Sequence, residues 1–382
     1  MNPLNPLFAI TVFLIAFITG YIIKLISKPK TDVGRHQTID GMRGFLALSV
    51  FIHHSSIWYQ FIQTGGAWDA PKSNLYTQLG KTSVTLFFMI TSFLFVSKLL
   101  NTNDKEFNWR YFFRSRIVRI APMYYFSVLL VFLIVMAVSH WKLNVGSKEF
   151  INSIFSWFIF IINGNYKINN CDVTGIINAG VVWSLSYEWL FYFSLPLIGL
   201  LVLKIKPSKF YIIISVVFIL LFLSVHEVNA NIVYSFGGGA IAPVLIKYTS
   251  LKNKADHVLS SIIVLVCLLS IGAFDNVDDT ACKIFIIIVF TYIALGNSLF
   301  GLLKNSTLKL LGEISYSTYL LHGIILFSVL YLGIGIEKAK QFSPMEYCII
   351  IFIIAPIVVI ISFGGYKLIE KPFMDRYNKK EK

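Results

Sequence analysis

Residues 344–366 read PMEYCIIIFIIAPIVVIISFGGY, a run whose one charged residue is Glu346. A helix needs about 20 mostly apolar residues to cross the hydrocarbon core of a bilayer, and this run has that length. The sequence therefore predicts a membrane-spanning helix here. Working outward from it, we expect ten further stretches of this kind, at about 7–27, 41–61, 80–100, 118–139, 182–203, 209–226, 230–247, 257–274, 281–303 and 309–333.

The bulk composition also indicates a membrane protein. The 382 residues are 56% hydrophobic and 16% aromatic with 14% charged, at a mean hydropathy of +0.72, which exceeds what a soluble domain can bury. The 33 Lys and Arg against 19 Asp and Glu lie in short runs between apolar stretches, which is typical of membrane topology and not of nucleic-acid binding. The four cysteines have no metal-ligand spacing, so we expect no metal site.

The placement of basic residues predicts the topology. A further apolar run at about 150–162 is short for a crossing, so we expect a re-entrant or interfacial helix there. If this run does not cross, all the basic segments fall on one side, which the positive-inside rule makes the cytoplasm. The N-terminus is then outside and the C-terminus cytoplasmic. The first stretch lacks a small-residue cleavage site, so we expect a retained anchor and not a signal peptide.

The predicted fold is all-α, a polytopic helical bundle of about eleven transmembrane helices with one short re-entrant or interfacial helix. We expect an extra N-terminal transmembrane anchor at 1–35, one membrane domain at 36–373 and a basic cytoplasmic tail at 374–382. Polar groups inside the apolar segments narrow the search for a site, because they cost several kcal/mol there and usually mark function.

The first polar cluster is Asp40-Gly-Met-Arg43-Gly, followed by His53 and His54. Arg43 and His54 share one helix face, about 16 Å apart along the axis. A neutral imidazole can accept a hydroxyl proton near neutral pH and return it, so His54 is a candidate general base. The alternative is a structural histidine that is hydrogen-bonded to a neighbouring helix. His53, one residue away, is the second candidate.

The second cluster contains Arg114, Arg116 and Arg119, just before Pro122. Arg116 and Arg119 are one helical turn apart, and two guanidinium groups so placed can bind a phosphate or pyrophosphate together. The alternative is that these residues only set the topology, because basic residues are common at cytoplasmic helix ends.

Two more clusters lie further along the chain. In the third, Glu188 is expected about 9 Å into the membrane from the outer face, a depth similar to that of His54 in a core about 30 Å thick, so the two side chains can meet. Alternatively, Trp183 and Tyr187 belong to the interfacial aromatic belt and Glu188 pairs with a lysine. The fourth is a polar helix face that suits packing as well as chemistry. Their candidate residues are Trp183, Ser184, Ser186, Glu188, Ser315, Tyr316, Tyr319 and His322.

Taken together, these motifs resemble the acyltransferase 3 family of integral membrane O-acyltransferases. The resemblance rests on Asp40-Gly-x-Arg-Gly with His54 fourteen residues after the aspartate, Arg116-x-x-Arg119, Trp183-Ser-Leu-Ser-x-Glu-x-x-Phe-Tyr192, Ser315-Tyr-x-x-Tyr-Leu-x-His322 and the terminal Ile369-Glu-Lys-Pro-Phe373. It runs from Asp40 to the C-terminus and makes 36–373 an acyltransferase 3-like domain. The first helix, at about 7–27, precedes the usual start of that family.

The resemblance implies transfer of an acyl group, often acetyl from acetyl-CoA, to a hydroxyl of a glycan such as O-antigen or exopolysaccharide, in the cytoplasmic (inner) membrane of a bacterium. In this interpretation Arg116 and Arg119, helped by Arg43 and Arg114, hold the phosphates of acyl-CoA. His54 is the general base or a transient acyl carrier, and Glu188 orients it. Expected partners are acyl-CoA, a glycan or lipid-linked sugar and the lipid bilayer, without nucleic acid. The rival hypothesis is a transporter or flippase, since buried ionisable groups also build transport paths.

Overall fold

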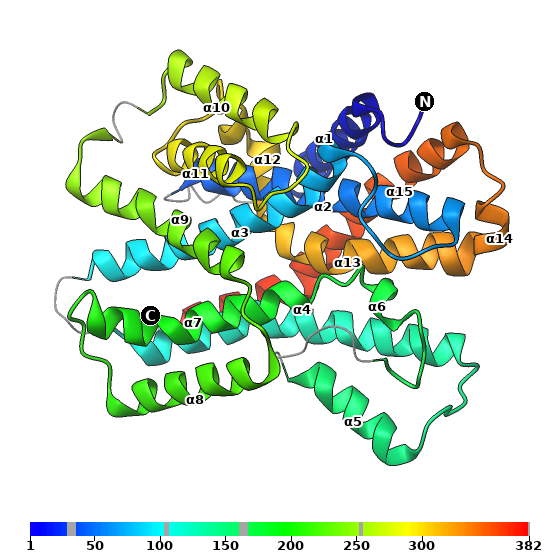
Figure 1. Ribbon diagram of the computed structural model, residues 1–382, viewed down its shortest axis with the longest axis horizontal. Coiled ribbons are helices and arrows are strands. Elements are labelled where there is room, and N and C mark those ends of the chain that lie inside the picture. Colours follow the sequence, from blue (N-terminus) through cyan, green and yellow to red (C-terminus); the bar gives the residue numbers. More distant parts are fainter. Residues whose placement is uncertain (29–35, 103–106, 160–166, 252–254, 381–382) are drawn as a thin grey trace. The chain divides into compact units, whose positions relative to one another are not determined.

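The computed structural model describes residues 1–28, 36–102, 107–159, 167–251 and 255–380 (Figure 1). These residues form helices joined by loops, and no strand occurs among them, which confirms the predicted all-α class. The chain divides into two compact units, each made of segments far apart in sequence. Unit 1 comprises 1–87, 176–179 and 249–366, and unit 2 comprises 88–175, 180–248 and 367–382.

The helices of unit 1 are α1 (Pro6–Ser27), α2 (Gln37–Thr64), α10 (Val258–Ile271), α11 (Thr280–Ala294), η2 (Leu302–Lys304), α12 (Ser306–Glu313), α13 (Ser315–Phe327), η3 (Ser328–Ile334), α14 (Ile336–Ala339) and α15 (Pro344–Gly365). Those of unit 2 are α4 (Trp109–Val138), α5 (Ser147–Phe158), α7 (Trp183–Leu201), α8 (Lys209–Val225), α9 (Ala230–Tyr248) and α16 (Lys371–Lys380). The division falls inside α3 (Asn74–Leu100), α6 (Thr174–Ile177) and η4 (Tyr366–Glu370).

Local signals in the sequence set where several helices begin. The Asn5 side chain accepts a hydrogen bond from the Leu7 amide, and Pro6 occupies the first turn of α1, where its missing N–H costs nothing. At α15, Ser343 and Glu346 form a capping box, in which each side chain accepts from the backbone amide of the other. At α4 and α12, the side chains of Asn108 and Asn305 accept single hydrogen bonds from the amides of Tyr111 and Thr307.

The count of eleven crossings is only partly supported. Six helical segments of the described residues are long and apolar enough to cross a membrane, and three shorter apolar helices, α8, α10 and α11, accompany them. The six segments are Pro6–Ser27, Asn74–Leu100, Trp109–Val138, Ala230–Tyr248, Ser315–Ile334 and Pro344–Tyr377. α2 and α7 are not among the six, because their polar clusters lower their mean hydropathy.

The predicted span at 309–333 is interrupted. α12 ends at Glu313, Ile314 departs from helical geometry (φ −84°, ψ 2°), and α13 begins at Ser315. The break lies in the polar stretch Gly312-Glu-Ile-Ser-Tyr-Ser-Thr318, and the apolar helical segment long enough to cross a membrane is Ser315–Ile334.

The short run at 150–162 forms α5, while its residues 160–162 lie outside the described chain. A helix of 12 residues spans about 18 Å, too short for a core of about 30 Å. Ile151 and Phe155 are exposed on it, whereas Trp157 is fully buried and its carbonyl accepts the Tyr124 hydroxyl of α4 at 2.6 Å. Exposed apolar side chains on one side of a short helix, with a buried side chain on the other, are expected of an interfacial helix.

The glycines of the first motif allow α2 to touch η2 and α12 through backbone atoms. A Cβ atom added at Gly41 would lie 2.0 Å from the Leu303 carbonyl oxygen, and one at Gly44 would lie 2.6 Å from that of Leu308. On the facing helix, a Cβ atom at Gly312 would lie 1.8 Å from the Asp40 oxygen. These three positions accept only glycine without a backbone shift, and Figure 1 shows α2 and α12 side by side.

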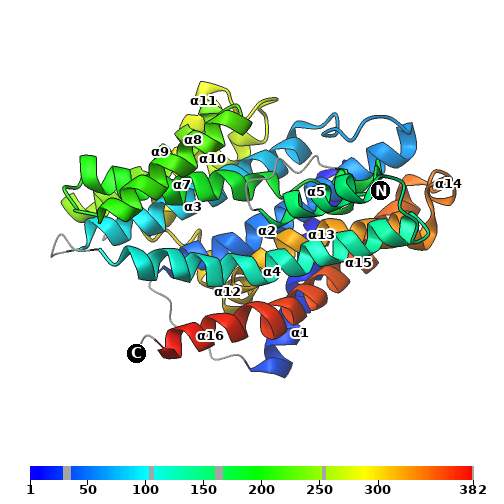
Figure 2. The same cartoon turned by 90° about the horizontal axis from the view of Figure 1, so that it is seen from below.

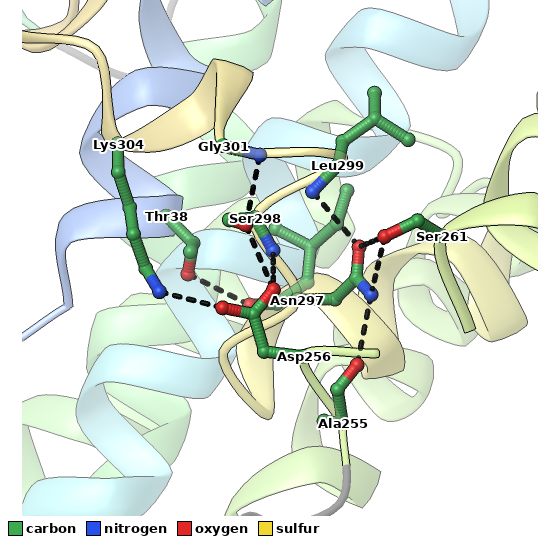
Figure 3. A network of polar contacts seen from close by, with 10 residues as sticks. Thr38, Ala255, Asp256, Ser261, Asn297, Ser298, Leu299, Gly301 and Lys304 are labelled. Carbon is green, nitrogen blue, oxygen red and sulfur yellow. Dashed lines mark hydrogen bonds and ion pairs between the residues drawn. The ribbon is translucent and has the colours of Figure 1, made fainter. Parts of the chain in front are cut away.

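A polar network secures the segment that leads into α12 (Figure 3). Asp256 accepts hydrogen bonds from the amide and the hydroxyl of Ser298, at 2.8 and 2.7 Å, and pairs with Lys304 at 2.6 Å. The Asn297 amide group donates to the Ala255 carbonyl at 2.8 Å. At the base of α2, the Thr38 hydroxyl donates to the last turn of α11 at 2.8 Å. The network therefore fixes the loop that positions α12 against α2.

Asp256 lies outside the membrane-spanning segments. Burial raises the pKa of its carboxyl, but the hydrogen bonds from Lys304 and Ser298 outweigh burial, so the pKa lies below its usual value. A pKa lowered by folding means that the charged form stabilises the fold at neutral pH, and that this stabilisation is lost as the pH falls through the lowered pKa.

We expect Gly312→Ala to destabilise unit 1 by about 3 kcal/mol, because the backbone oxygen in its way cannot rotate aside. Gly364→Ala is the matched control, since a Cβ atom there meets nothing within 4 Å and alanine favours a helix by about 1 kcal/mol. Thermal unfolding of both variants in one detergent measures the difference. Equal midpoints for the two variants would contradict the close backbone contact.

We expect Asp256→Asn to lower stability by about 1 kcal/mol at pH 7, because the loop loses charged hydrogen bonds that are partly open to solvent. The difference between Asp256→Asn and wild type should shrink as the pH falls from the usual carboxyl pKa towards the lowered pKa of Asp256, and vanish below it, where the wild-type carboxyl is protonated too. Asp279→Asn, at an exposed position, is the control. If Asp256→Asn were less stable than wild type by the same amount at low pH, the charge of Asp256 would not be the source of the stabilisation.

Candidate functional site

The candidate site in unit 1 is built around two histidines from α2 and α13. His54 lies half-buried on α2, and His322 is fully buried on α13. The Nε2 atom of His322 lies 3.0 Å from Nδ1 of His54, although 268 residues separate them. Helices α2 and α13 pack against each other, and this packing brings the two histidines together.

The neighbouring carbonyl groups determine which ring nitrogens carry protons. His322 Nδ1 lies 3.0 Å from the Thr318 oxygen, and His54 Nδ1 lies 3.0 Å from the Val50 oxygen. A carbonyl only accepts, so each Nδ1 carries the proton. His322 Nε2 is then an acceptor that faces the Nδ1–H of His54. The lone pair of His54 is left on Nε2, the atom for which the described residues offer no partner.

His53 is fixed in a different way. Its ring is buried, its Nδ1 donates to the Tyr76 carbonyl at 2.7 Å, and its face lies against Gly80, where a Cβ atom would come within 2.3 Å of the ring. The ring of His53 meets that of His54 edge-on at 5.0 Å. Of the two candidate bases, His53 is therefore the one that is enclosed by its neighbours, whereas His54 is only half-buried.

Of the other candidates of unit 1, Tyr319 lies beside this pair. Tyr319 is buried, with its ring 6.3 Å from that of His322, and Ser315 starts α13 with a hydroxyl that has no hydrogen-bond partner among the described residues. Tyr316, Asp40 and Arg43 are half-buried.

Unit 2 holds the predicted carboxylate. Glu188 accepts a hydrogen bond from the buried Tyr192 hydroxyl one turn along α7. The Arg116 guanidinium lies 4.7 Å from the Phe95 ring centroid and close enough to Tyr192 to interact with its hydroxyl. Unit 2 therefore brings Arg116 and Glu188 to the same tyrosine. His54 belongs to unit 1, so a meeting of His54 with Glu188 stays a prediction.

Arg119 has a partner that the sequence interpretation did not assign to it. Its Nη1 atom lies 3.3 Å from a carboxylate oxygen of Glu370, which is fully buried, and 3.2 Å from the Met374 sulfur. Figure 2 shows α16, in red, beside α4. The terminal motif at 369–373 thus supplies a counter-charge for the second arginine of the Arg116-x-x-Arg119 pair.

The remaining candidates of unit 2 are Trp183, Ser184, Ser186 and Arg114, and they differ in their burial. Trp183 is exposed and packs edge-on against Phe88 and Tyr187. Ser184 is buried and donates to the Val181 carbonyl at 3.0 Å, and Ser186 is buried too. Arg114 is exposed.

Comparison with known proteins agrees with the motifs and the helical membrane fold. The family model Acyl_transf_3, described as an acyltransferase domain, matches residues 36–363. The chain belongs to this acyltransferase family. No curated protein and no solved structure matches it. The match begins at residue 36, after α1, which in this acyltransferase packs against α12 and α15.

Two residues with clear contacts in the acyltransferase had no assigned role in the sequence interpretation. Tyr192 was visible as the residue four after Glu188, a spacing that puts both on one helix face. Glu370 was visible as a carboxylate between an apolar helix and a basic end. Among the described residues, no group of three or more His, Cys, Asp or Glu could hold a metal ion.

We expect Glu370→Gln to destabilise the acyltransferase by about 3 kcal/mol at most, because it leaves the Arg119 charge without its buried partner while 21% of the Arg119 side chain stays exposed. The double variant Arg119→Met with Glu370→Met removes both charges and should recover most of this loss. Thermal unfolding of the two variants measures the recovery.

The same double variant tests the donor role of Arg119. If Arg119 also binds donor phosphate, the recovered double variant needs more acyl-CoA for half-maximal rate. An unchanged requirement assigns Arg119 to the ion pair alone.

Proposed function

We propose that this acyltransferase is an O-acetyltransferase, which moves an acetyl group from acetyl-CoA to a hydroxyl of a cell-surface glycan, with His54 as the general base. The observation that carries the proposal is the half-buried imidazole of His54, held at Nδ1 by Val50 and His322 with its lone pair on Nε2. An imidazole so oriented can accept a proton from a hydroxyl within hydrogen-bond reach of Nε2.

The reaction balances without a metal or a redox cofactor. The acceptor hydroxyl gives its proton to His54 Nε2 as its oxygen attacks the thioester carbonyl. The bond between carbonyl carbon and sulfur then breaks, and the proton passes from His54 to the thiolate of CoA. In the alternative order, His54 Nε2 attacks the thioester carbonyl and the carbon–sulfur bond breaks, which releases CoA as a thiolate. The acceptor hydroxyl then attacks the acetyl-imidazole, the carbon–nitrogen bond breaks, and the hydroxyl proton passes to the thiolate.

For the donor we propose a site near Arg116, with Arg43 and Arg114 as further candidate phosphate contacts. Arg116 supports the proposal because it is half-buried, lies against an aromatic ring and interacts with the same tyrosine as Glu188. Guanidinium groups bind phosphates well. Glu188 is proposed to orient the reacting groups, and Arg119 contributes to the donor site only as far as its pairing with Glu370 allows.

We place the enzyme in the cytoplasmic membrane of a bacterium, with the N-terminus outside and the C-terminus inside. The six apolar helical segments long enough to cross, all within the described residues, and the distribution of basic residues support this placement. Membership of an acyltransferase family favours an enzyme over the transporter or flippase.

We expect His54→Ala to lower the rate of acetyl transfer from labelled acetyl-CoA by about 10²- to 10⁴-fold, the usual contribution of a general base. The measurement uses purified protein in lipid nanodiscs with a glycan extract as acceptor, read by NMR of O-acetyl groups. His257→Ala, at an exposed position of the same unit, is the control.

Two outcomes would contradict the proposal. Wild-type acetylation by His54→Ala would remove His54 from catalysis, and loss of activity in His53→Ala alone would transfer the role to His53. Recovery of labelled acetyl-imidazole on His54 after a quench would favour the carrier over the base.

A further inference from the structure

The contact between His322 and His54 is directional. His322 Nδ1 donates to Thr318, one turn back on its own helix, so its Nε2 can only accept while the ring is neutral. The atom 3.0 Å away is the protonated Nδ1 of His54. His322 is fully buried and is held on α13, whose neighbouring Gly323 lies so close to backbone that a Cβ atom there would come within 2.5 Å of the Asn178 carbonyl carbon.

We propose that His322 is a positioning residue for the reaction, which keeps His54 in the tautomer with its lone pair on Nε2 and strengthens its hydrogen bond when His54 takes up a proton. This inference rests on the proposed function and names the group that supports its base. When Nε2 of His54 accepts the proton of the acceptor hydroxyl, the positive charge spreads to Nδ1–H. A hydrogen bond from a charged donor is about twice as strong as one from a neutral donor.

The Val50 carbonyl favours the same tautomer, but it does not hold the His54 ring from outside α2. It lies in the same turn of α2 as His54, so its bond to Nδ1 forms within the helix and does not depend on a second helix. The bond to His322 comes from α13 and fixes the plane of the His54 ring from outside. Without His322, the His54 ring can turn about its side-chain bonds and lose its alignment with the acceptor hydroxyl.

Three variants of His322 separate this role from packing. His322→Gln places an amide oxygen near the position of Nε2 and keeps an acceptor for His54, whereas His322→Asn is too short to reach it. His322→Leu fills much of the space without an acceptor. We expect Leu and Asn to lower kcat by roughly 10- to 100-fold, the loss usual when a histidine loses its orienting partner, and Gln to recover most of it.

The readout that a packing role would not move is the split between kcat and KM. We expect the KM for acetyl-CoA to stay within about twofold in all three variants, since His322 contacts neither phosphate nor thioester in this scheme. Thermal midpoints measured alongside identify any variant that is merely unfolded. The His322→Gln and His322→Asn variants can then be compared directly, because both side chains are amides and differ by one methylene.

A double variant tests the dependence on His54. In a His54→Ala background, His322→Leu should cause no further loss of the residual rate, because the base that it positions is already absent. The inference is overturned by a wild-type kcat in His322→Leu, by equal rates for Gln and Asn, or by multiplied losses in the double variant. An active His54→Ala protein would instead overturn the proposed role of His54.

Discussion

The close approach of α2 to η2 and α12 is the constraint on which the rest of unit 1 depends. The backbones touch at Gly41, Gly44 and Gly312, where a side chain can be inserted only with a backbone shift. Such contact positions a helix more tightly than side-chain packing does, because backbone atoms have no rotamers to adjust. α13 follows α12 after one non-helical residue, so the placement of α12 also sets where His322 meets His54.

The two motifs that end in a histidine therefore have two parts with different tasks. In the first, the glycines of 40–44 set the helix contact, and His54, more than two turns later, carries the chemistry that we propose. In the second, Gly312 leaves room for the Asp40 backbone, and His322 lies within hydrogen-bond distance of His54. The polar network around Asp256 stabilises the loop between these parts without touching either histidine.

The sequence predicted the class of fold, the helical nature of the apolar stretches and the histidine that the structure places in a hydrogen-bonded pair. Hydropathy could not show the break at Ile314, because a window of about 20 residues averages over one non-helical residue. His322 was a candidate support residue, but its pairing with His54 depends on how two helices meet across 268 residues. The partners of His53 are a backbone carbonyl and a glycine, which leave no signal of their own in a sequence. The Arg119 pairing was hidden for a similar reason, since its carboxylate lies at the far end of the chain.

The pairing of Arg119 with Glu370 has a consequence for how the protein is made. Arg119 is synthesised and enters the membrane long before Glu370 exists, and both units contain segments from early and late parts of the chain. Domains generally fold as units during synthesis when their residues are contiguous. Here neither unit can close until its later segment is present, and α4 carries Arg119 without its carboxylate partner until Glu370 has been synthesised. Unit 2 is therefore completed only after residues 367–382 have been synthesised, when Glu370 can pair with Arg119.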